Sequence, residues 1–240
     1  MGKIINKDII GTALLDYHSG NYTENITTHS SIAGKDEMEL PWLFRTFHEM
    51  PVIEQTALQL CKGSVLDLGC GAGSHTLYLQ NKNFDVKAID ISKGAIETCI
   101  HRGVKNAKVE DVWNIKNEKF DTILVLMNGV GISQTLDNLK VFLNHLKTLI
   151  NKNGQILLDS SDVIYMYQGK NGEHHLPKNK NYYGEVLFEL TYKNKCSKPL
   201  NWLFVSFDIL KLYANEADLQ CELIKEGYHY DYLAKLTLLK

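Results

Sequence analysis

Apolar and polar residues in the central part of the chain follow two alternating periods, one typical of helices and one typical of strands. Apolar positions recur at helical spacing over residues 52–61, 92–102 and 136–150, and a further helix is expected to start with Ser74 as its N-cap. Between the helices lie short apolar runs that suit buried strands, at residues 65–68, 85–89, 107–109, 120–127 and 155–159. This order predicts a parallel sheet with right-handed crossovers and helices on both faces.

The pattern changes on both sides of this region. Residues 1–50 mix polar turns with aromatic residues, and we expect them to form an N-terminal helical lid. The elements expected after residue 160 are paired strands at 185–192 and 201–207, a helix at 208–214 and closing strands at 219–225 and 232–239. We predict a single domain over residues 1–240, with a lid-like segment at 1–50, a core at 52–162, a hairpin insertion at 163–207 and closing elements at 208–240.

Composition and charge narrow the class of protein. The 240 residues include 26 Lys and Arg against 28 Asp and Glu and are 44% hydrophobic, as in an ordinary globular domain. A nucleic-acid partner is not expected, because phosphate binding leaves a basic excess. The cysteines are odd in number, form no CxxC pair and are expected to be reduced thiols, at positions 61, 70, 99, 196 and 221.

Targeting signals and membrane spans are not expected either. The longest apolar runs, such as 123–127, reach only strand length, which is far below the roughly 18 residues of a membrane helix. The polar residues Asn6, Lys7 and Asp8 interrupt the region where a signal peptide would be apolar. We therefore predict a cytoplasmic protein without a membrane partner.

The junction between the first strand and the second helix carries the strongest chemical signal. It has the form DxGxGxG, with Asp67 followed by Gly69, Gly71 and Gly73, and Asp90 ends the next strand about twenty residues later. Glycines allow a tight turn close to a ligand, and the following helix N-terminus presents free N–H groups. An acid at the tip of the second strand can accept both hydroxyls of a ribose. The motif therefore predicts an adenosine-type ligand.

The spacing separates two classes of nucleoside cofactor. A dinucleotide site favours GxGxxG, but its third glycine would fall on Ser74. The observed motif resembles that of the class I S-adenosylmethionine-dependent methyltransferases, and the resemblance covers about residues 52–162. It implies a Rossmann-like, doubly wound, mostly parallel seven-stranded α/β sheet with an antiparallel C-terminal strand, here with the N-terminal lid and a β-hairpin insertion after strand five.

The resemblance also implies roles for particular residues. The Asp67 equivalent lies near the amino-acid end of the cofactor, the Asp90 equivalent holds the ribose, and Asp111 stands where the family places an acid near the adenine amino group. The cofactor-binding residues expected on this basis are Asp67, Gly69, Cys70, Gly71, Gly73, Asp90, Ile91, Asp111, Val112 and Met127. The cofactor would be S-adenosylmethionine, with S-adenosylhomocysteine as product.

The acceptor is expected at the carboxyl ends of strands four and five, and Asn128, Asp162 and His48 are candidate catalytic residues. Asn128 does not begin the proline-aromatic motif with which DNA amino-methyltransferases cradle a base, which further disfavours nucleic acid. Asp159 and Asp162 are acidic, but no full ligand set is evident and no metal is predicted. Aromatic and polar residues near the N-terminus either cover the acceptor or simply pack that segment onto the core: Tyr17, Tyr22, Trp42, Phe44, Arg45, Phe47, His48 and Glu49.

The leading hypothesis is methyl transfer from S-adenosylmethionine to a small-molecule acceptor whose identity the sequence does not reveal. Two alternatives remain at this point: an NAD(P)-dependent oxidoreductase, and a non-catalytic cofactor-binding module of the same fold. The sequence assigns neither a catalytic base nor an oligomeric state.

Overall fold

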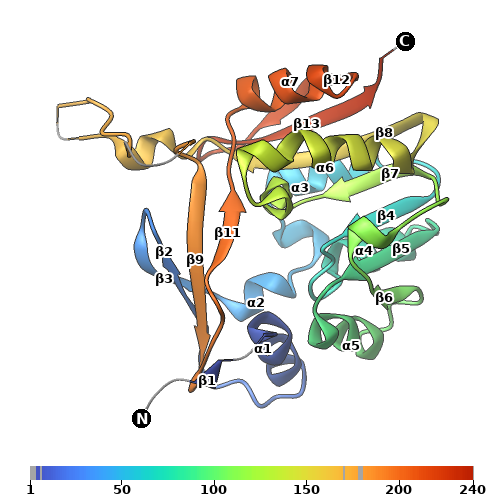
Figure 1. Cartoon of the computed structure of the whole chain (residues 1–240). Coiled ribbons are helices and arrows are strands. Elements are labelled where there is room, and N and C mark those ends of the chain that lie inside the picture. Colours follow the sequence, from blue (N-terminus) through green and yellow to red (C-terminus); the bar gives the residue numbers. More distant parts are fainter. Residues whose placement is uncertain (1–3, 6, 170, 178–180, 240) are drawn as a thin grey trace.

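Seven strands form one sheet in the computed structural model, which describes residues 4–5, 7–169, 171–177 and 181–239. In spatial order they are β12 (Leu219–Glu226), β13 (Asp231–Leu238), β8 (Ile150–Ser161), β7 (Phe120–Val125), β4 (Val65–Leu68), β5 (Val86–Asp90) and β6 (Ala107–Val109). Neighbouring strands are parallel except at β13, which is antiparallel to both β8 and β12. The predicted mostly parallel sheet with an antiparallel C-terminal strand is confirmed (Figure 1).

Helices cover both faces of this sheet. Neighbouring residues of a strand point to opposite faces, so each face packs against its own helices. The helices are α3 (Val52–Leu60), α4 (Ser74–Asn81), α5 (Lys93–His101), α6 (Leu136–Leu149) and α7 (Phe207–Glu216). Leu66 and Ile123 belong to the core formed with α6 and α7, whereas Val65 and Leu124 belong to the core formed with α3 and α4. None of the helices in the described part of the chain is long and apolar enough to cross a membrane.

The order of the strands reverses between β4 and β7. The chain passes from β4 through β5 to β6 at one edge, and β7 then returns to the other side of β4. Crossovers on opposite faces leave a crevice at such a point, beyond the carboxyl ends of the strands. This crevice is where a ligand of the sheet is expected to bind.

A second sheet combines the N-terminal segment with the insertion after β8. Its strands in order are β1 (Ile4–Ile5), β10 (Lys195–Cys196), β9 (Glu185–Tyr192), β2 (Ile26–Ser30) and β3 (Gly34–Met38), with β11 (Leu200–Leu203) also paired to β9. The expected pair of strands after β8 is therefore present as β9 and β11.

The expectation that residues 1–50 form a purely helical lid is incomplete. The helices there are α1 (Ile9–His18), α2 (Leu40–Leu43) and the 3-10 turn η1 (Phe47–Glu49). The same segment also contributes β2 and β3, and Thr28 of β2 lies opposite Leu190 of β9. The pairing partner is remote in sequence, so the local pattern of β2 did not reveal it.

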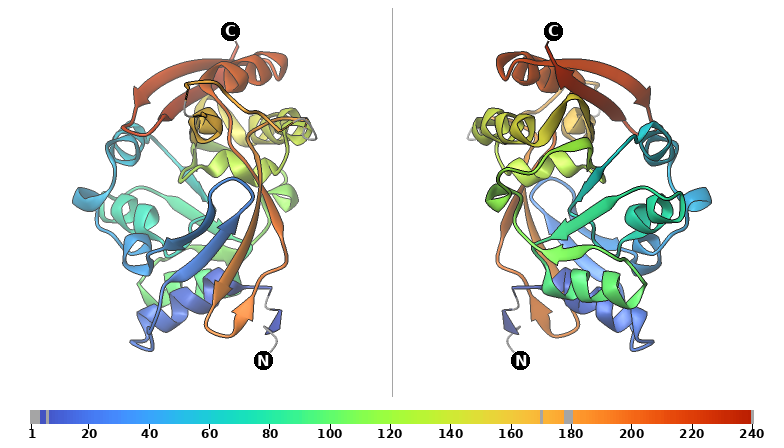
Figure 2. Two further views of the ribbon diagram at one scale, coloured as in Figure 1. Left: turned by 90° about the vertical axis from the view of Figure 1, so that its left-hand side faces the viewer. Right: turned by 90° about the vertical axis from the view of Figure 1, so that its right-hand side faces the viewer.

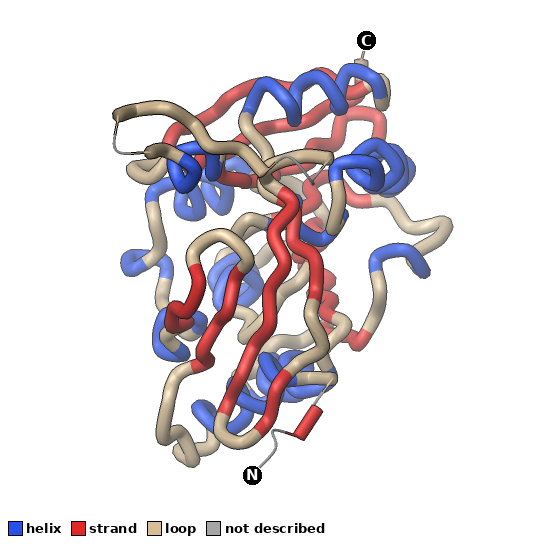
Figure 3. Tube along the Cα trace, turned by 60° about the vertical axis from the view of Figure 1, so that its left-hand side comes forward, coloured by secondary structure: helices blue, strands red, loops and turns tan. Residues whose placement is uncertain are grey.

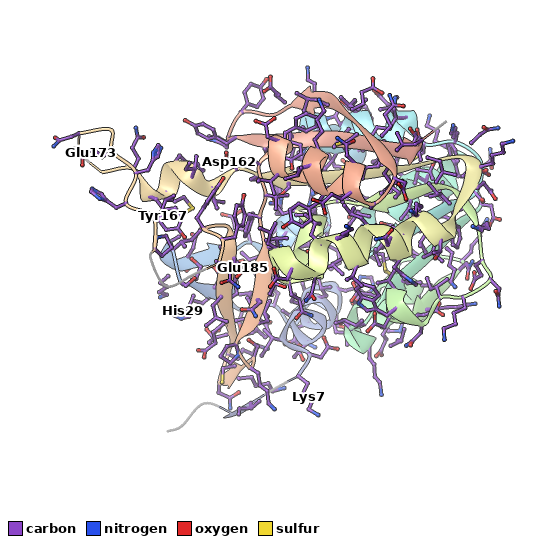
Figure 4. The ribbon with its side chains drawn as sticks, turned by 45° about the horizontal axis from the view of Figure 1, so that its top comes forward. Lys7, His29, Asp162, Tyr167, Glu173 and Glu185 are labelled. Carbon is purple, nitrogen blue, oxygen red and sulfur yellow. The ribbon has the colours of Figure 1, made fainter. Side chains whose placement is uncertain are left out.

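The second sheet stands across the end of the seven-stranded sheet toward which β7 points (Figures 1, 2 and 3). Trp202 of β11 donates its Nε1–H to the carbonyl oxygen of Asn128 at 3.0 Å, immediately after β7. Its indole covers Gly131 of the 3-10 segment η3 (Gly129–Ser133), where an added Cβ would lie 2.1 Å from the ring. Glu185, at the start of β9, accepts the N–H of Leu136 at 2.9 Å at the start of α6 (Figure 4).

Asp8 fixes the N-terminal segment to α5. Its Oδ1 accepts the N–H of Gly11 at 2.9 Å and the hydroxyl of Ser92 at 2.7 Å, and its Oδ2 accepts the N–H of Gly94 at 3.0 Å. One carboxylate therefore accepts hydrogen bonds from the N-terminal ends of both α1 and α5. The two helices touch through their glycines, since a Cβ on Gly94 would lie 2.5 Å from the backbone of Gly11.

Several element boundaries differ from expectation, including the end of β11 at Leu203 rather than at residue 207. The N-cap of α4 is Gly73 rather than Ser74, whose hydroxyl instead donates to the carbonyl oxygen of Leu43 at 3.0 Å. β7 ends at Val125, because Met127 and Asn128 adopt left-handed backbone conformations that a strand does not allow. β8 begins at residue 150 rather than 155.

Candidate active site

The loop between β4 and α4 contains three glycines with left-handed backbones. Gly69, Gly71 and Gly73 have φ angles of 75°, 53° and 81°, which glycine adopts without steric cost. The N–H groups of Gly69 and Cys70 donate to the carbonyl oxygen of Ile89 at 2.9 and 3.0 Å. The loop is thus tied to β5 and ends at the positive N-terminus of α4, where polar and anionic groups are stabilised.

Asp90, the last residue of β5, holds this loop from the neighbouring strand. Its Oδ2 accepts the N–H of Gly71 at 3.0 Å, and its Oδ1 accepts the N–H of Ser92 at 2.9 Å. Burial raises the pKa of Asp90 above its ordinary value, although these two N–H groups act in the opposite direction. The next residue, Ile91, is 75% exposed. A carboxylate beside an exposed aliphatic side chain suits the hydroxyls and the base of a nucleoside.

The side chains of three other predicted ligand-binding residues differ in their exposure to solvent. The Cys70 thiol is buried 3.8 Å from the thiol of Cys99, in the core beneath the loop. Asp111 is exposed, and its Oδ1 accepts the N–H of Trp113 at 3.2 Å. The side chain of Val112 is buried in the core with α6, and its carbonyl oxygen lies 2.7 Å from Nε2 of His145.

A buried ionic cluster, formed by Arg45, Glu54 and His75, adjoins Asp67. The Glu54 carboxylate binds the Arg45 guanidinium and also lies 2.7 Å from Nε2 of His75. Asp67 is itself 2% exposed and accepts the hydroxyl of Thr76 at 2.5 Å. The cluster was not predictable from local pattern, although the position of His75, two residues after the last glycine of the motif, was a signal.

The members of the cluster stabilise one another's charged forms. Burial would raise the pKa of Glu54, but the hydrogen bonds and charges of His75 and Arg45 hold it below its ordinary value. Burial would lower the pKa of His75, but Glu54 and the charge of Asp67 hold it above its ordinary value. The cluster therefore places the Arg45 guanidinium and the His75 imidazole beside Glu54, with Asp67 near His75. Within the described residues, Nε of Arg45 is buried without a hydrogen-bond partner.

The turn after β7 lies at the same edge. Met127 is 39% exposed, and its neighbour Asn128 is half-buried. Oδ1 of Asn128 accepts the hydroxyl of Ser161 at 2.8 Å. The buried carboxylate of Asp159, in β8, accepts N–H groups from the same turn. The structure thus brings the glycine loop, the turn after β7 and the end of β8 together at one edge of the sheet.

Of the two other catalytic candidates, Asp162 directly follows β8 and His48 belongs to η1. Oδ1 of Asp162 accepts the hydroxyl of Tyr183 at 2.8 Å and the N–H of Ile164 at 3.0 Å. Figure 4 shows Asp162 at the base of the segment that extends outward past Tyr167 to Glu173. His48 is exposed on η1, and among the described residues its ring contacts that of Phe47.

The aromatic residues of the N-terminal segment pack mainly against helices. Tyr17 contacts Phe44 with ring centroids 4.6 Å apart, and Phe47 stacks on Tyr78 of α4 at 4.2 Å. Arg102, the C-cap of α5, lies 4.8 Å from the ring of Phe44. Of the two interpretations of these aromatics, packing of the segment is the one that these contacts favour.

Asp159 lies near the end of β8, and Asp162 directly follows that strand. In the parts of the chain that the structure describes, no group of three or more His, Cys, Asp or Glu side chains is arranged to hold a metal ion. Asp159 and Asp162 instead accept hydrogen bonds from protein donors.

The chain is similar to known methyltransferases. A family described as a methyltransferase domain matches residues 62–207. A crystal structure of an S-adenosylmethionine-dependent methyltransferase from Bacteroides fragilis, in complex with S-adenosylhomocysteine, is 39% identical, with a TM-score of 0.91 over 98% of this chain and 96% of that one. No protein of curated function matches the chain by sequence.

More distant structures share the fold. The CcbJ methyltransferase from Streptomyces caelestis is 11% identical, with a TM-score of 0.62 over 98% of this chain and 100% of that one. An S-adenosylmethionine-dependent methyltransferase from Clostridium acetobutylicum is 17% identical, with a TM-score of 0.56 over 79% of this chain and 89% of that one.

Proposed function

The chain belongs to the class I S-adenosylmethionine-dependent methyltransferases, and from that premise we propose that its acceptor is a small molecule bound between the two sheets. The predicted cofactor is confirmed by this membership, which also removes the NAD(P)-dependent oxidoreductase alternative. The observation that carries the proposal is the position of the second sheet across the carboxyl ends of β7 and β8 (Figure 2). A sheet on that side would obstruct a bulky polymer more than a small acceptor.

The residues proposed to hold the cofactor fit its parts. Beside Gly71 an added Cβ would meet no atom within 4 Å, which leaves space for a ligand against the loop. Asp90 would accept the ribose hydroxyls, with Ile91 against the adenine. The orphaned Nε of Arg45 suits the carboxylate of the methionine part, near Asp67. The Asp111 carboxylate would lie near the adenine amino group. Backbone groups of the other predicted residues complete the proposed site: Gly69, Cys70, Gly73, Val112 and Met127.

The bound sulfonium supplies an activated methyl group that leaves a neutral thioether behind. The protein then contributes mainly alignment of the acceptor and exclusion of water. Trp202, seated on the turn that carries Asn128, would keep water from that side of the acceptor. Asn128 could orient an acceptor by hydrogen bonding, and Asp162 could hold a proton from an amine or hydroxyl.

We also propose that the protein has no nucleic-acid partner and that it acts in the cytoplasm. Balanced charge, with 26 basic and 28 acidic residues, supports a small acceptor and no nucleic-acid partner. Dispersed cysteines that include four buried thiols support a reducing, cytoplasmic location.

Titration and turnover test this proposal. We expect calorimetry to detect binding of S-adenosylhomocysteine and no comparable binding of NAD. Incubation with S-adenosylmethionine and panels of small amines, phenols and hydroxy compounds should release S-adenosylhomocysteine with at least one panel, but not with DNA or RNA oligonucleotides. Methylation of an oligonucleotide, with none of any small molecule, would overturn the small-acceptor proposal.

Alanine at Gly71 and alanine at Gly73 should have different effects, because the space beside the two residues differs. A Cβ at Gly73 would lie 2.9 Å from Sγ of Cys99 and 3.0 Å from Val104, within the packed core. Gly73→Ala should therefore lower the free energy of unfolding by about 2–4 kcal/mol. Gly71→Ala should cost about 1 kcal/mol for its left-handed backbone, but it should weaken S-adenosylhomocysteine binding more than tenfold.

Denaturant unfolding and calorimetric titration of both variants check this contrast. Because the open space beside Gly71 is assigned to the cofactor, an unchanged affinity in Gly71→Ala would contradict the assignment.

A further inference from the structure

The turn after β7 has an unfavourable backbone. Met127 and Asn128 have φ angles of 65° and 55°, so two successive residues other than glycine are left-handed. Each such residue is disfavoured by contacts of its Cβ with the backbone. A turn of this kind persists only where surrounding groups hold it.

Asp159 of β8 stabilises this turn through two hydrogen bonds. Its Oδ2 accepts the N–H of Met127 at 3.1 Å, and its Oδ1 accepts the N–H of Gly129 at 3.2 Å. Asp159 is 3% exposed. N–H groups of successive residues in such turns converge into a concave site for an anion. Here an internal carboxylate occupies that site.

The other side of the turn is held by two more contacts. Oδ1 of Asn128 accepts the hydroxyl of Ser161 at 2.8 Å, and its carbonyl oxygen accepts the Nε1–H of Trp202 at 3.0 Å. The turn is thus clamped between β8 and β11. Of these contacts, those of Asp159 are the ones that fix the backbone N–H groups themselves.

We infer that Asp159 is a positioning residue for methyl transfer: its carboxylate binds the N–H groups of Met127 and Gly129 and so sets where Met127 and Asn128 meet the cofactor and acceptor. This inference rests on the proposed function, which places Met127 against the cofactor and Asn128 beside the acceptor. It gives Asp159 a role through the turn, without contact with the reacting atoms.

Protonation of Asp159 should weaken this hold. Burial raises its pKa to about 7, with the negative charge of Glu54 from α3 acting in the same direction. The two N–H groups and the charge of His75 from α4 oppose the shift. Tyr232 of β13, also buried, is a further titratable neighbour. An ionised carboxylate accepts both N–H groups fully, whereas a protonated carboxyl is a poor acceptor through its hydroxyl oxygen.

Ionisation of Asp159 should therefore strengthen ligand binding but lower the contribution of this group to folding stability. Affinity for S-adenosylhomocysteine should rise as the pH rises through about 7, because the turn is held best by the ionised form. The folded pKa lies above the roughly 3.9 of an unfolded aspartate. The contribution of this group to stability is thus complete below about pH 4 and is lost as the pH rises through about 7.

Asp159→Asn tests the inference, with Asp121→Asn as its matched control. Asp121 is also a strand carboxylate that accepts a backbone N–H, from Ser64 at 2.9 Å, but it lies at the amino end of β7. At pH 8, Asp159→Asn should bind S-adenosylhomocysteine about tenfold or more weakly than the wild type. It should also lose the change of affinity near pH 7, and Asp121→Asn should keep both affinity and pH profile.

Equal affinity of Asp159→Asn and wild type at pH 8 would overturn the positioning role. If this variant does not fold, the wild-type profile decides, because an affinity that is constant between pH 5.5 and 8.5 also contradicts the inference. A wild-type protein that binds no S-adenosylhomocysteine at any pH would instead count against the proposed cofactor site, so the two failures are distinguishable.

Discussion

Replacing Glu54 by alanine is expected to lower the free energy of unfolding by about 3–5 kcal/mol, because it leaves Arg45 and His75 buried without their shared carboxylate. The side chains of Arg45 and Glu54 are only 3% and 5% exposed, so water does not replace the lost partner. Denaturant unfolding at pH 7 measures the change through the midpoint and the slope of the transition.

Glu216→Ala provides the control for losing a glutamate from an ion pair. Glu216 pairs with Lys140 at 3.1 Å, but both side chains are 46% exposed. Its removal should change the free energy of unfolding by less than about 1 kcal/mol. A Glu54→Ala protein as stable as Glu216→Ala would mean that the cluster is hydrated in solution.

Replacing Asp90 by alanine is expected to weaken S-adenosylhomocysteine binding by at least about 100-fold. Two hydrogen bonds from ribose hydroxyls to a carboxylate contribute roughly 1.5–3 kcal/mol each, and 1.4 kcal/mol corresponds to tenfold. The variant also loses the acceptor for the N–H of Gly71, so the loop itself becomes less ordered. Both effects act in the same direction on affinity.

Asp85→Ala is the matched control, since Asp85 is an exposed acid immediately before the amino end of the same strand. It should bind S-adenosylhomocysteine as the wild type does in calorimetric titration. The circular dichroism spectrum of Asp90→Ala should match that of the wild type. A folded Asp90→Ala protein with less than a fivefold loss of affinity would exclude Asp90 from the ribose site.

Features that depend on local pattern were predictable from the sequence. The strands of the main sheet alternate with amphipathic helices, and the glycine loop lies between a strand and a helix where its spacing could be recognised. Asp90 could be assigned because it ends the next strand. In each case the signal lies within about twenty residues of chain.

Features that depend on remote partners were not predictable in the same way. Glu54 stands in an amphipathic helix, where an acid normally faces solvent, and its partners Arg45 and His75 come from other elements. Asp159 resembled an ordinary strand end, because the left-handed conformations of Met127 and Asn128 leave little trace in the sequence. Asn followed by Gly was a weak signal, since both tolerate that conformation.

The second sheet pairs strands that the ribosome synthesises far apart in time. Thr28 pairs with Leu190, which is synthesised 162 residues later (190 minus 28). At about 5–20 residues per second, the ribosome needs roughly 10–30 s to supply that partner. By then β4, β5, β6, β7 and β8 have all been translated. These five strands of the main sheet can therefore pair before β2 meets β9, whereas β12 and β13 of the same sheet are translated only after β9 and β11.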